Sequence, residues 1–243
     1  MNTRDLWTTW DWRKEPEAPR SWEHPERRVV IVEGLHTGSP SPAALTAVGP
    51  LRDAVEHGLI AVLVEPPGVL LAWYPDECPR FVPALRGERQ TDLSPEALRA
   101  LTSVPAPHRA LVVSPREELD ITAGQNERWN FPTAIVDGRP VEWADPGPKY
   151  IGVDLVICQG PTGPDAWPMH PAWVRRLKQD CDAAGVAFAM TGWGEWAPRE
   201  SAPDVLRDMR MLLGGVEVVR INHEHPGRRL LDGVEHLALP EGL

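Results

Sequence analysis

The sequence is poor in cysteine, in phenylalanine and tyrosine, and in long apolar runs. Its 243 residues include 3 Cys, at positions 78, 158 and 181, which lie too far apart to indicate a disulfide framework and are compatible with a reducing compartment. No apolar run approaches the roughly 20 residues of a transmembrane helix, and the N-terminus lacks the apolar core of a signal peptide. We therefore expect a soluble, cytoplasmic protein that does not associate with a membrane.

The sequence also has fewer basic than acidic residues. There are 25 Lys and Arg against 35 Asp and Glu, which gives a formal net charge of −10. An acidic surface repels phosphate groups at long range, so generic nucleic-acid binding is disfavoured. The hydrophobic fraction of 42% and the charged fraction of 25% are ordinary for a globular protein with a core, so wholesale disorder is not expected.

Proline and tryptophan are abundant instead, with 27 Pro and 11 Trp. The prolines predict many loops and sharply ended elements. Residues 1–27 combine Trp, Pro and charge without clear periodicity and are interpreted as a Trp-rich N-terminal arm. This arm either packs on the main body or binds a partner. We predict that residues 28–243 form a single α/β domain.

Short apolar runs and helix-capping patterns alternate along that domain. The predicted strands are 28–33, 59–65, 69–73, 110–113, 153–158, 186–190 and 216–221, and the predicted helices are 42–57, 95–103, 171–184 and 203–213. Residues 75–92 are rich in proline and are predicted to be a loop. Asp-Gly pairs between apolar residues predict hairpins at 134–143 and 229–236.

Strands that alternate with helices predict an α/β fold with a largely parallel sheet. We favour a partial or irregular (β/α) barrel. An open doubly wound sheet is the alternative. In either form, ligands collect where the strands end at their carboxyl edge.

Four consecutive patterns carry a resemblance to a known family. An apolar strand runs into Gln-Gly-Pro-Thr-Gly-Pro, followed by Trp-Pro-Met-His-Pro-Ala-Trp-Val-Arg, Asp-Cys-Asp-Ala-Ala-Gly-Val-Ala-Phe and Trp-Gly-Glu-Trp; these patterns occupy 156–164, 167–175, 180–188 and 193–196. In this order they resemble a phage family labelled by the gene-product numbers thirty-seven and sixty-eight, whose members are similar to radical-SAM proteins on a (β/α) barrel. The resemblance covers residues 94–243 approximately, and it implies a phage origin and hence the host cytoplasm.

The departures from that family concern chemistry. The family's glycine-loop Glu is Pro161 here, and its Lys-Gln before the Trp-Gly-Glu-Trp motif is Thr191-Gly192. Radical-SAM chemistry requires three closely spaced cysteines to hold an iron–sulfur cluster, whereas Cys158 and Cys181 fall on a predicted strand and helix face. The resemblance therefore implies a retained scaffold that lacks an iron–sulfur cluster and radical catalysis.

Candidate site residues follow two predicted strands. Gly160, Thr162 and Gly163 follow the predicted strand 153–158. The two glycines would allow a ligand to approach the backbone closely; a tight structural turn is the alternative. Trp193 and Glu195 follow the next strand, where an indole and a carboxylate suit a base or an adenine, although Glu195 is also suited to pairing with an arginine. His170 is either an acid/base or the cap of the helix that begins at Pro171. His223 and His225 lack an obvious third ligand, so we assign no metal site.

Three functional hypotheses remain. The first is a phage-encoded radical-SAM-like protein without an iron–sulfur cluster that binds a nucleotide-like or S-adenosyl ligand, S-adenosylmethionine being the candidate cofactor, or a partner protein. The second is a phage–host interaction protein that modulates a host factor. The third keeps a non-radical enzymatic activity, with His170 as acid/base and Glu195 as its partner.

Overall fold

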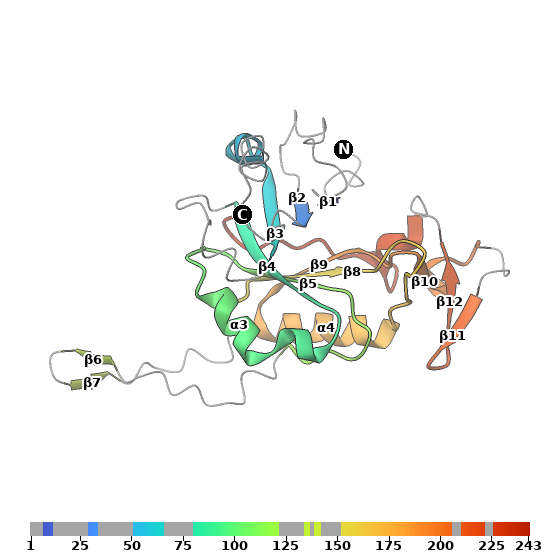
Figure 1. Cartoon of the computed structure of the whole chain (residues 1–243). Coiled ribbons are helices and arrows are strands. Elements are labelled where there is room, and N and C mark those ends of the chain that lie inside the picture. Colours follow the sequence, from blue (N-terminus) through green and yellow to red (C-terminus); the bar gives the residue numbers. More distant parts are fainter. Residues whose placement is uncertain are drawn as a thin grey trace.

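A computed structural model describes residues 7–11, 29–33, 51–65, 80–121, 134–136, 139–141, 152–205, 210–221 and 226–243 (Figure 1). Its central element is a sheet of seven strands in the order β1-β2-β3-β4-β5-β8-β9. The strands are β1 (Trp7–Asp11), β2 (Val29–Glu33), β3 (Ile60–Val64), β4 (Phe81–Gly87), β5 (Ala110–Val113), β8 (Leu155–Gln159) and β9 (Ala187–Gly192). Every neighbouring pair in this sheet is parallel.

The spatial order of these strands follows their order in the sequence. A doubly wound sheet reverses its order at a switch point, whereas a barrel adds each new strand beside the previous one. The sheet is curled into a half-barrel, which confirms the predicted α/β fold in its partial-barrel form. β1 lies within the predicted N-terminal arm, where no strand was predicted.

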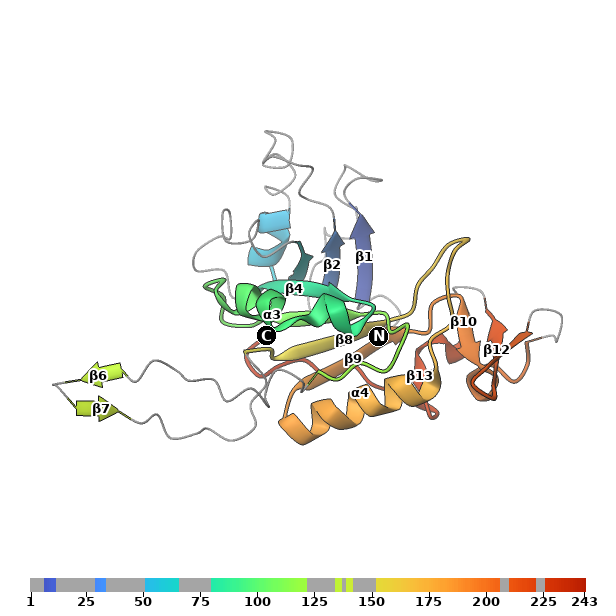
Figure 2. The same ribbon diagram turned by 60° about the horizontal axis from the view of Figure 1, so that its bottom comes forward.

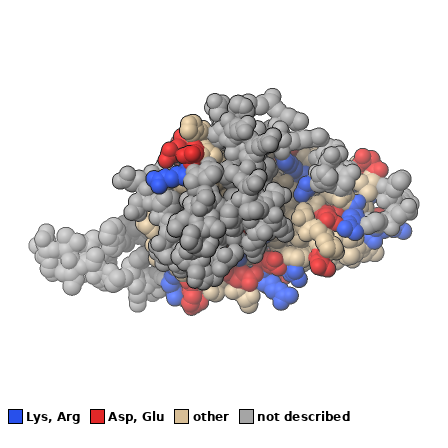
Figure 3. Space-filling view, turned by 45° about the horizontal axis from the view of Figure 1, so that its top comes forward, with Lys and Arg blue, Asp and Glu red and all other residues tan. Residues whose placement is uncertain are grey.

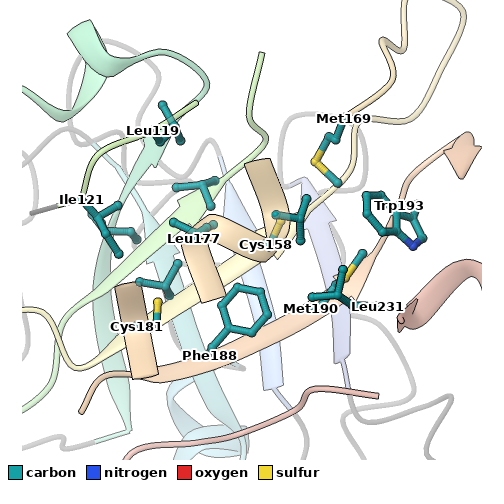
Figure 4. Close-up of a cluster of buried hydrophobic side chains, with 14 of the residues drawn as sticks. Leu119, Ile121, Cys158, Met169, Leu177, Cys181, Phe188, Met190, Trp193 and Leu231 are labelled. Carbon is teal, nitrogen blue, oxygen red and sulfur yellow. The ribbon is translucent and has the colours of Figure 1, made fainter. Parts of the chain in front are cut away.

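The helices within the described ranges cover one face of the sheet. These are helical residues 51–56, α3 (Pro95–Thr102) and α4 (Pro171–Ala184), and a short 3-10 helix, η3 (Gln90–Leu93), precedes α3. Leu51 and Val55 pack on Val30 and Leu63 in one apolar cluster. In a second cluster, Leu177 and Cys181 of α4 face Cys158 and Phe188 of β8 and β9, with Trp193, Met190 and Leu231 at its end (Figure 4).

The opposite, inner face of the half-barrel has a floor of small apolar side chains. The cluster on this face consists of Val29, Ile31, Ile60, Val62, Val82, Ala84, Ala110, Val112, Leu155, Ile157 and Ala189. Leu237 and Leu243 pack against it. Residues 236–238 run antiparallel to the outer edge of β9, where the Met190 N–H donates to His236 O (2.6 Å) and the Ala238 N–H donates to Phe188 O (3.2 Å). This C-terminal segment therefore closes one edge of the sheet.

A small antiparallel sheet lies beyond the end of β9 (Figure 2). Its order is β10-β12-β11, from β10 (Trp196–Pro198), β11 (Arg210–Leu213) and β12 (Val216–Arg220). The 3-10 helix η4 (Arg199–Ser201) follows β10, and η5 (Pro226–Arg229) precedes a hairpin of β13 (Leu230–Leu231) and β14 (Val234–Glu235). The predicted 229–236 hairpin is thus present, as is that of β6 (Ala134–Val136) and β7 (Arg139–Val141).

Two predictions of secondary structure were wrong. The predicted loop 75–92 contains β4, a strand whose Pro83 sits opposite Leu63 in a buried sheet. Proline is disfavoured in central strands because it lacks an N–H, and burial of its neighbours outweighs that preference here. The predicted helix 203–213 contains β11, because Gly214 and Gly215 both have positive φ (55° and 86°) and form the tight turn of a hairpin with β12.

Several predictions fall on other parts of the chain. The predicted strand 69–73, Cys78, His223 and His225 lie outside the described residues, as does most of the predicted helix 42–57. None of the helices in the described ranges has the length and apolar character needed to cross a lipid bilayer.

Candidate functional site

Two loops cross in direct backbone contact where β8 and β9 end. The Gly160 N–H donates to Gly192 O (2.7 Å), and the Glu195 N–H donates to Pro161 O (3.1 Å). A Cβ on Gly160 would overlap the carbonyl group of Trp193, and a Cβ on Gly194 would overlap the carbonyl oxygen of Pro161. Glycine is required at both positions because the two backbones leave no room for a side chain. The predicted glycine loop is therefore a tight structural crossing at Gly160.

Glu195 fastens this crossing to the small antiparallel sheet. Its Oε1 accepts the Gly163 N–H (2.7 Å), and its Oε2 accepts the Nε–H of Arg220 (2.9 Å) and a second, short hydrogen bond from the same guanidinium. These hydrogen bonds, first that of Arg220 and then that of Gly163, lower the pKa of the Glu195 carboxyl. Both carboxylate oxygens are thus engaged within the protein, so Glu195 acts as a positioning residue.

Trp193 is part of the core. Its side chain is 1% exposed, and its indole N–H donates to Leu230 O (2.8 Å). The neighbouring Trp196 donates its indole N–H to Ala166 O (3.0 Å), which ties the loop after β8 to the start of β10. Buried indoles usually find such a partner. The Trp193 ring therefore offers no open face on which an adenine can stack.

His170 caps α4. Its Nδ1 accepts the Ala172 N–H (3.1 Å) at the first turn, directly before Pro171. Its ring contacts Trp173, with centroids 5.5 Å apart, and a Cβ on Gly214 would lie 2.9 Å from its Nε2. Because Nδ1 accepts a backbone hydrogen bond, the proton of the neutral ring lies on Nε2. Of the predicted ligand contacts, Thr162 alone is an exposed side chain.

The sequence analysis missed a row of polar side chains on the inner face. Side chains alternate between the two faces of each strand, so Glu33, Arg86, Ser114 and Gln159 continue the inner-face positions of β2, β4, β5 and β8. All four stand at the carboxyl ends of their strands, and the Ser114 hydroxyl donates to Gln159 O (2.6 Å). The apolar floor of the half-barrel therefore ends in a polar rim at the edge where barrel folds bind ligands.

Glu33 and Arg86 form an ion pair within this rim. The pair joins β2 to β4 across the intervening β3, and the two residues are 53 positions apart in the sequence. Their side chains are 21% and 31% exposed, so both reach solvent from a largely covered position. Burial lowers the pKa of the Arg86 guanidinium from its usual value.

Cys158 and Cys181, the cysteines that the structure describes, do not lie at this rim. Cys158 and Cys181 are fully buried on the outer face, between β8 and α4 (Figure 4). Burial is the main cause that raises the pKa of both thiols, that of Cys181 to about 12, and a thiolate is what iron requires. Within the described ranges, no three His, Cys, Asp or Glu side chains are placed to hold a metal ion.

A surface pocket of about 310 Å³ lies beside the crossing, on the helix-covered side. It is lined by Arg175 of α4, by Trp193, Pro198, Glu200 and Ser201, and by the turn at Asp232 and Gly233. Arg175 donates to both oxygens of Asp232 (2.7 to 3.0 Å) and to Glu200 (3.4 Å). These hydrogen bonds occupy most of the N–H groups of the Arg175 guanidinium. The charged side chains at the pocket wall therefore pair mainly with one another.

The described charges on the face shown in Figure 3 are mixed. Lys and Arg side chains alternate with Asp and Glu on the face shown in Figure 3, and neither sign forms a continuous patch there. Such a surface provides no extended track for a phosphate backbone.

The structure brings the predicted site residues together but gives most of them structural roles. Gly160, Gly163, Trp193 and Glu195 meet at one crossing, and His170 caps the helix that follows it. The polar rim lies across the same carboxyl edge. A signal for the rim exists in the sequence, because a charged residue at the carboxyl end of an apolar strand of a barrel marks a candidate ligand contact, as at Glu33 after the apolar run 29–32.

Comparison with known proteins gave one match. Residues 88–240, more than half of the chain, match the family described as "Protein of unknown function (DUF5131)". Neither the curated proteins nor the solved structures contain a match to this chain.

Proposed function

The chain belongs to the DUF5131 family, and on that premise we propose that it is a phage-encoded, radical-SAM-like protein without an iron–sulfur cluster. In this proposal it binds a nucleotide-like or S-adenosyl ligand on the inner face of the half-barrel, in the host cytoplasm, without radical catalysis. The observation that carries the proposal is the polar rim, because the partly exposed Glu33 and Arg86 side chains stand at the carboxyl ends of β2 and β4, above the buried apolar side chains of the inner face.

The loop crossing at Gly160 and Gly194 supports the site from one side. Its backbone is fixed by Glu195 and Arg220, so it forms a rigid wall. Thr162 stands exposed on this wall and is the predicted contact that remains accessible. We assign no catalytic role to His170 or Glu195, since each is held by hydrogen bonds within the protein.

The test is calorimetric titration of the purified chain with S-adenosylmethionine, S-adenosylhomocysteine and ATP. We expect saturable binding of the two S-adenosyl compounds, with ATP as the comparison. The variant Val64→Trp places a bulky ring on the inner face between β2 and β4 and is expected to abolish binding. Leu212→Trp, on the distant β11, is the matched control. Equal binding by both variants would move the ligand site elsewhere.

An interaction role is the second candidate, favoured by one observation. β11 is an edge strand of the small sheet, and its Leu212 and Met211 side chains are 75% and 41% exposed. Exposed apolar side chains on an edge strand are typical of a surface that pairs with another chain. In this second proposal the protein modulates a host factor through β11.

The two candidates separate through point variants. Deleting the N-terminal arm is unsuitable, because it removes β1 from the sheet. Leu212→Glu is expected to abolish retention of a host partner and to leave ligand titration unchanged if the second candidate is correct. Loss of ligand binding in Val64→Trp with unchanged partner retention would support the first.

A further inference from the structure

The edge strand β11 carries the most exposed large apolar side chain of the described residues, that of Leu212. We propose that this edge pairs with β11 of a second copy of the chain, antiparallel and about a two-fold axis at Leu212 (Figure 1). The proposal goes beyond both candidate functions. The second of them assigns the same edge to a host factor, and the two partners exclude each other on one copy.

The β11–β12 hairpin determines which backbone groups of β11 face outward. Its two-residue glycine turn makes Leu213 and Val216 a hydrogen-bonded pair. Hydrogen-bonded and non-hydrogen-bonded pairs alternate along an antiparallel ladder, so Leu212 and Arg210 direct their N–H and C=O groups away from β12. These outward groups form no hydrogen bond with any other part of the chain that the structure describes. A row of this kind is a template for the addition of a strand.

Charge and exposure select the register of this pairing. Outward-facing residues of two antiparallel edges lie opposite each other, so Arg210 or Leu212 of one copy faces Arg210 or Leu212 of the other. Two opposed Arg210 side chains would repel each other, and Arg210 opposite Leu212 would cover an apolar side chain with a charged one. With Leu212 opposite Leu212, Met211 lies beside Leu213 on the other face, and Arg210 lies beside Gly214, which has no side chain. In this register only apolar side chains meet.

The charge on β11 is balanced within its own sheet. Nη1 of Arg210 lies 3.9 Å from Oε1 of Glu217 on β12, so a second copy need not supply a counter-charge. Native sheets commonly protect an edge with Lys, Pro or an inward-pointing charge. The sequence of β11, Arg-Met-Leu-Leu, contains neither Lys nor Pro, and its single charge stands at its first residue. The strand therefore lacks the features that prevent pairing of edges.

The opposite edge of the small sheet does not offer the same contact. β10 has three residues, of which Ala197 and Pro198 are buried, and proline has no N–H to donate to a neighbouring strand. A pairing of β11 with β11 closes at two copies, because the same surface is used twice. Two four-residue strands make a contact smaller than the roughly 1,600 Å² of a standard stable interface. We therefore expect a reversible dimer whose population rises with concentration.

The first experiment measures the mass of the full chain by sedimentation equilibrium, from low micromolar to millimolar concentration. Leu212→Glu and Leu212→Lys each place like charges opposite each other at the two-fold axis, and each should weaken self-association at least tenfold. An equimolar mixture of the two variants should dimerise again, because Glu then faces Lys. Val234→Glu, at an exposed apolar side chain of β14, is the matched control and should associate as the wild type does.

The second experiment tests the register with a cysteine. Residues opposite each other in a hydrogen-bonded antiparallel pair have Cα atoms about 5.5 Å apart, a separation that a disulfide spans. Leu212→Cys in a Cys78→Ser background should therefore form a covalent dimer under mild oxidation, which a non-reducing gel resolves. Cys158 and Cys181 are buried and do not compete. Val234→Cys in the same background is the control and should remain a single chain.

Three results would overturn the inference. A wild-type mass of one chain at every concentration would leave the β11 edge to a host factor. A mass that rises beyond two chains would contradict the closed two-fold pairing. A dimer that persists in Leu212→Glu, or a mixture of the Glu and Lys variants that associates no better than either alone, would place the contact elsewhere. Recovery in the mixture also shows that both variants are folded, and titration with S-adenosylmethionine tests the proposed ligand site separately.

Discussion

The two halves of the carboxyl edge are built differently. In the β8–β9 half, two backbones cross at Gly160 and Gly194, Glu195 and Trp193 tie the crossing to its surroundings, and His170 caps the helix that follows. In the β2–β5 half, Glu33 and Arg86 form a partly exposed ion pair above small apolar side chains. The half that contains the recognisable motifs is thus a rigid scaffold, whereas the other half carries a partly exposed ion pair that we propose as a ligand contact.

The largest expected effect that tests this contrast is the slow reaction of the Cys158 and Cys181 thiols, which lie in the scaffold half. Burial raises the pKa of Cys181 from 9.0 to about 12 and also raises that of Cys158. Three pKa units reduce the thiolate about a thousandfold, so both thiols should react with iodoacetamide at pH 8 at least about a thousandfold more slowly in the native than in the denatured chain. A Cys78→Ser background isolates the two. Comparable rates in both states would show that the scaffold half is open.

Gly160→Ala should be the most destabilising substitution at the crossing. The added Cβ overlaps the Trp193 carbonyl, a backbone group that cannot rotate away. We expect a loss of about 3 kcal/mol in the free energy of unfolding, measured with denaturant. The control Gly185→Ala, where the Cβ meets nothing within 4 Å but φ is 68°, should lose about 1 kcal/mol. Similar losses for both would mean that the two loops do not touch.

Glu195→Gln should cost about 1 kcal/mol at neutral pH, since a charged hydrogen bond is lost in a partly solvated position. The folded-state pKa of Glu195 lies below its unfolded value, so this contribution is full above the unfolded pKa and is lost as the pH falls through the folded pKa. The stability difference between the wild type and the variant should therefore shrink in acid. Glu96→Gln, at an exposed Glu with its own Arg partner, is the control and should change the free energy of unfolding little at neutral pH.

His170→Ala should have the smallest effect, about 0.5 kcal/mol, because it removes one cap hydrogen bond. His170→Asp restores an acceptor at the helix N-terminus and should recover that loss. Ligand affinity should stay unchanged in both variants. If His170→Ala abolished ligand binding while the helix stayed stable, the division of the edge into scaffold and binding halves would be wrong.

Local sequence patterns correctly predicted the helices and strands that are determined by caps and short apolar runs. Ser94 caps α3 as its position before Pro95 predicts, and the run 110–113 forms β5 with the predicted bounds. β4 was missed because Pro83 indicates a loop, while burial on both faces of the sheet overrides that tendency. β11 was missed because the pattern of a short apolar segment is compatible with both a helix and a strand.

The candidate site was predictable only in part, for a topological reason. The glycine loop and the Trp-Gly-Glu-Trp motif were found because each is contiguous, yet their tertiary contacts turned them into scaffold. Glu33 and Arg86 are brought together by the register of three parallel strands, which no local pattern contains. Their role as a ligand contact stays a prediction.

The antiparallel pairing of residues 236–238 with β9 has a consequence for synthesis of the chain. β9 ends at Gly192, so its outer edge stays uncovered while the following segments are translated. An open strand edge is a template for unwanted pairing with other chains. The edge of β9 is therefore covered only after residues 236–238 have been synthesised. Synthesis that stalled before residue 236 would release a chain whose β9 edge is exposed.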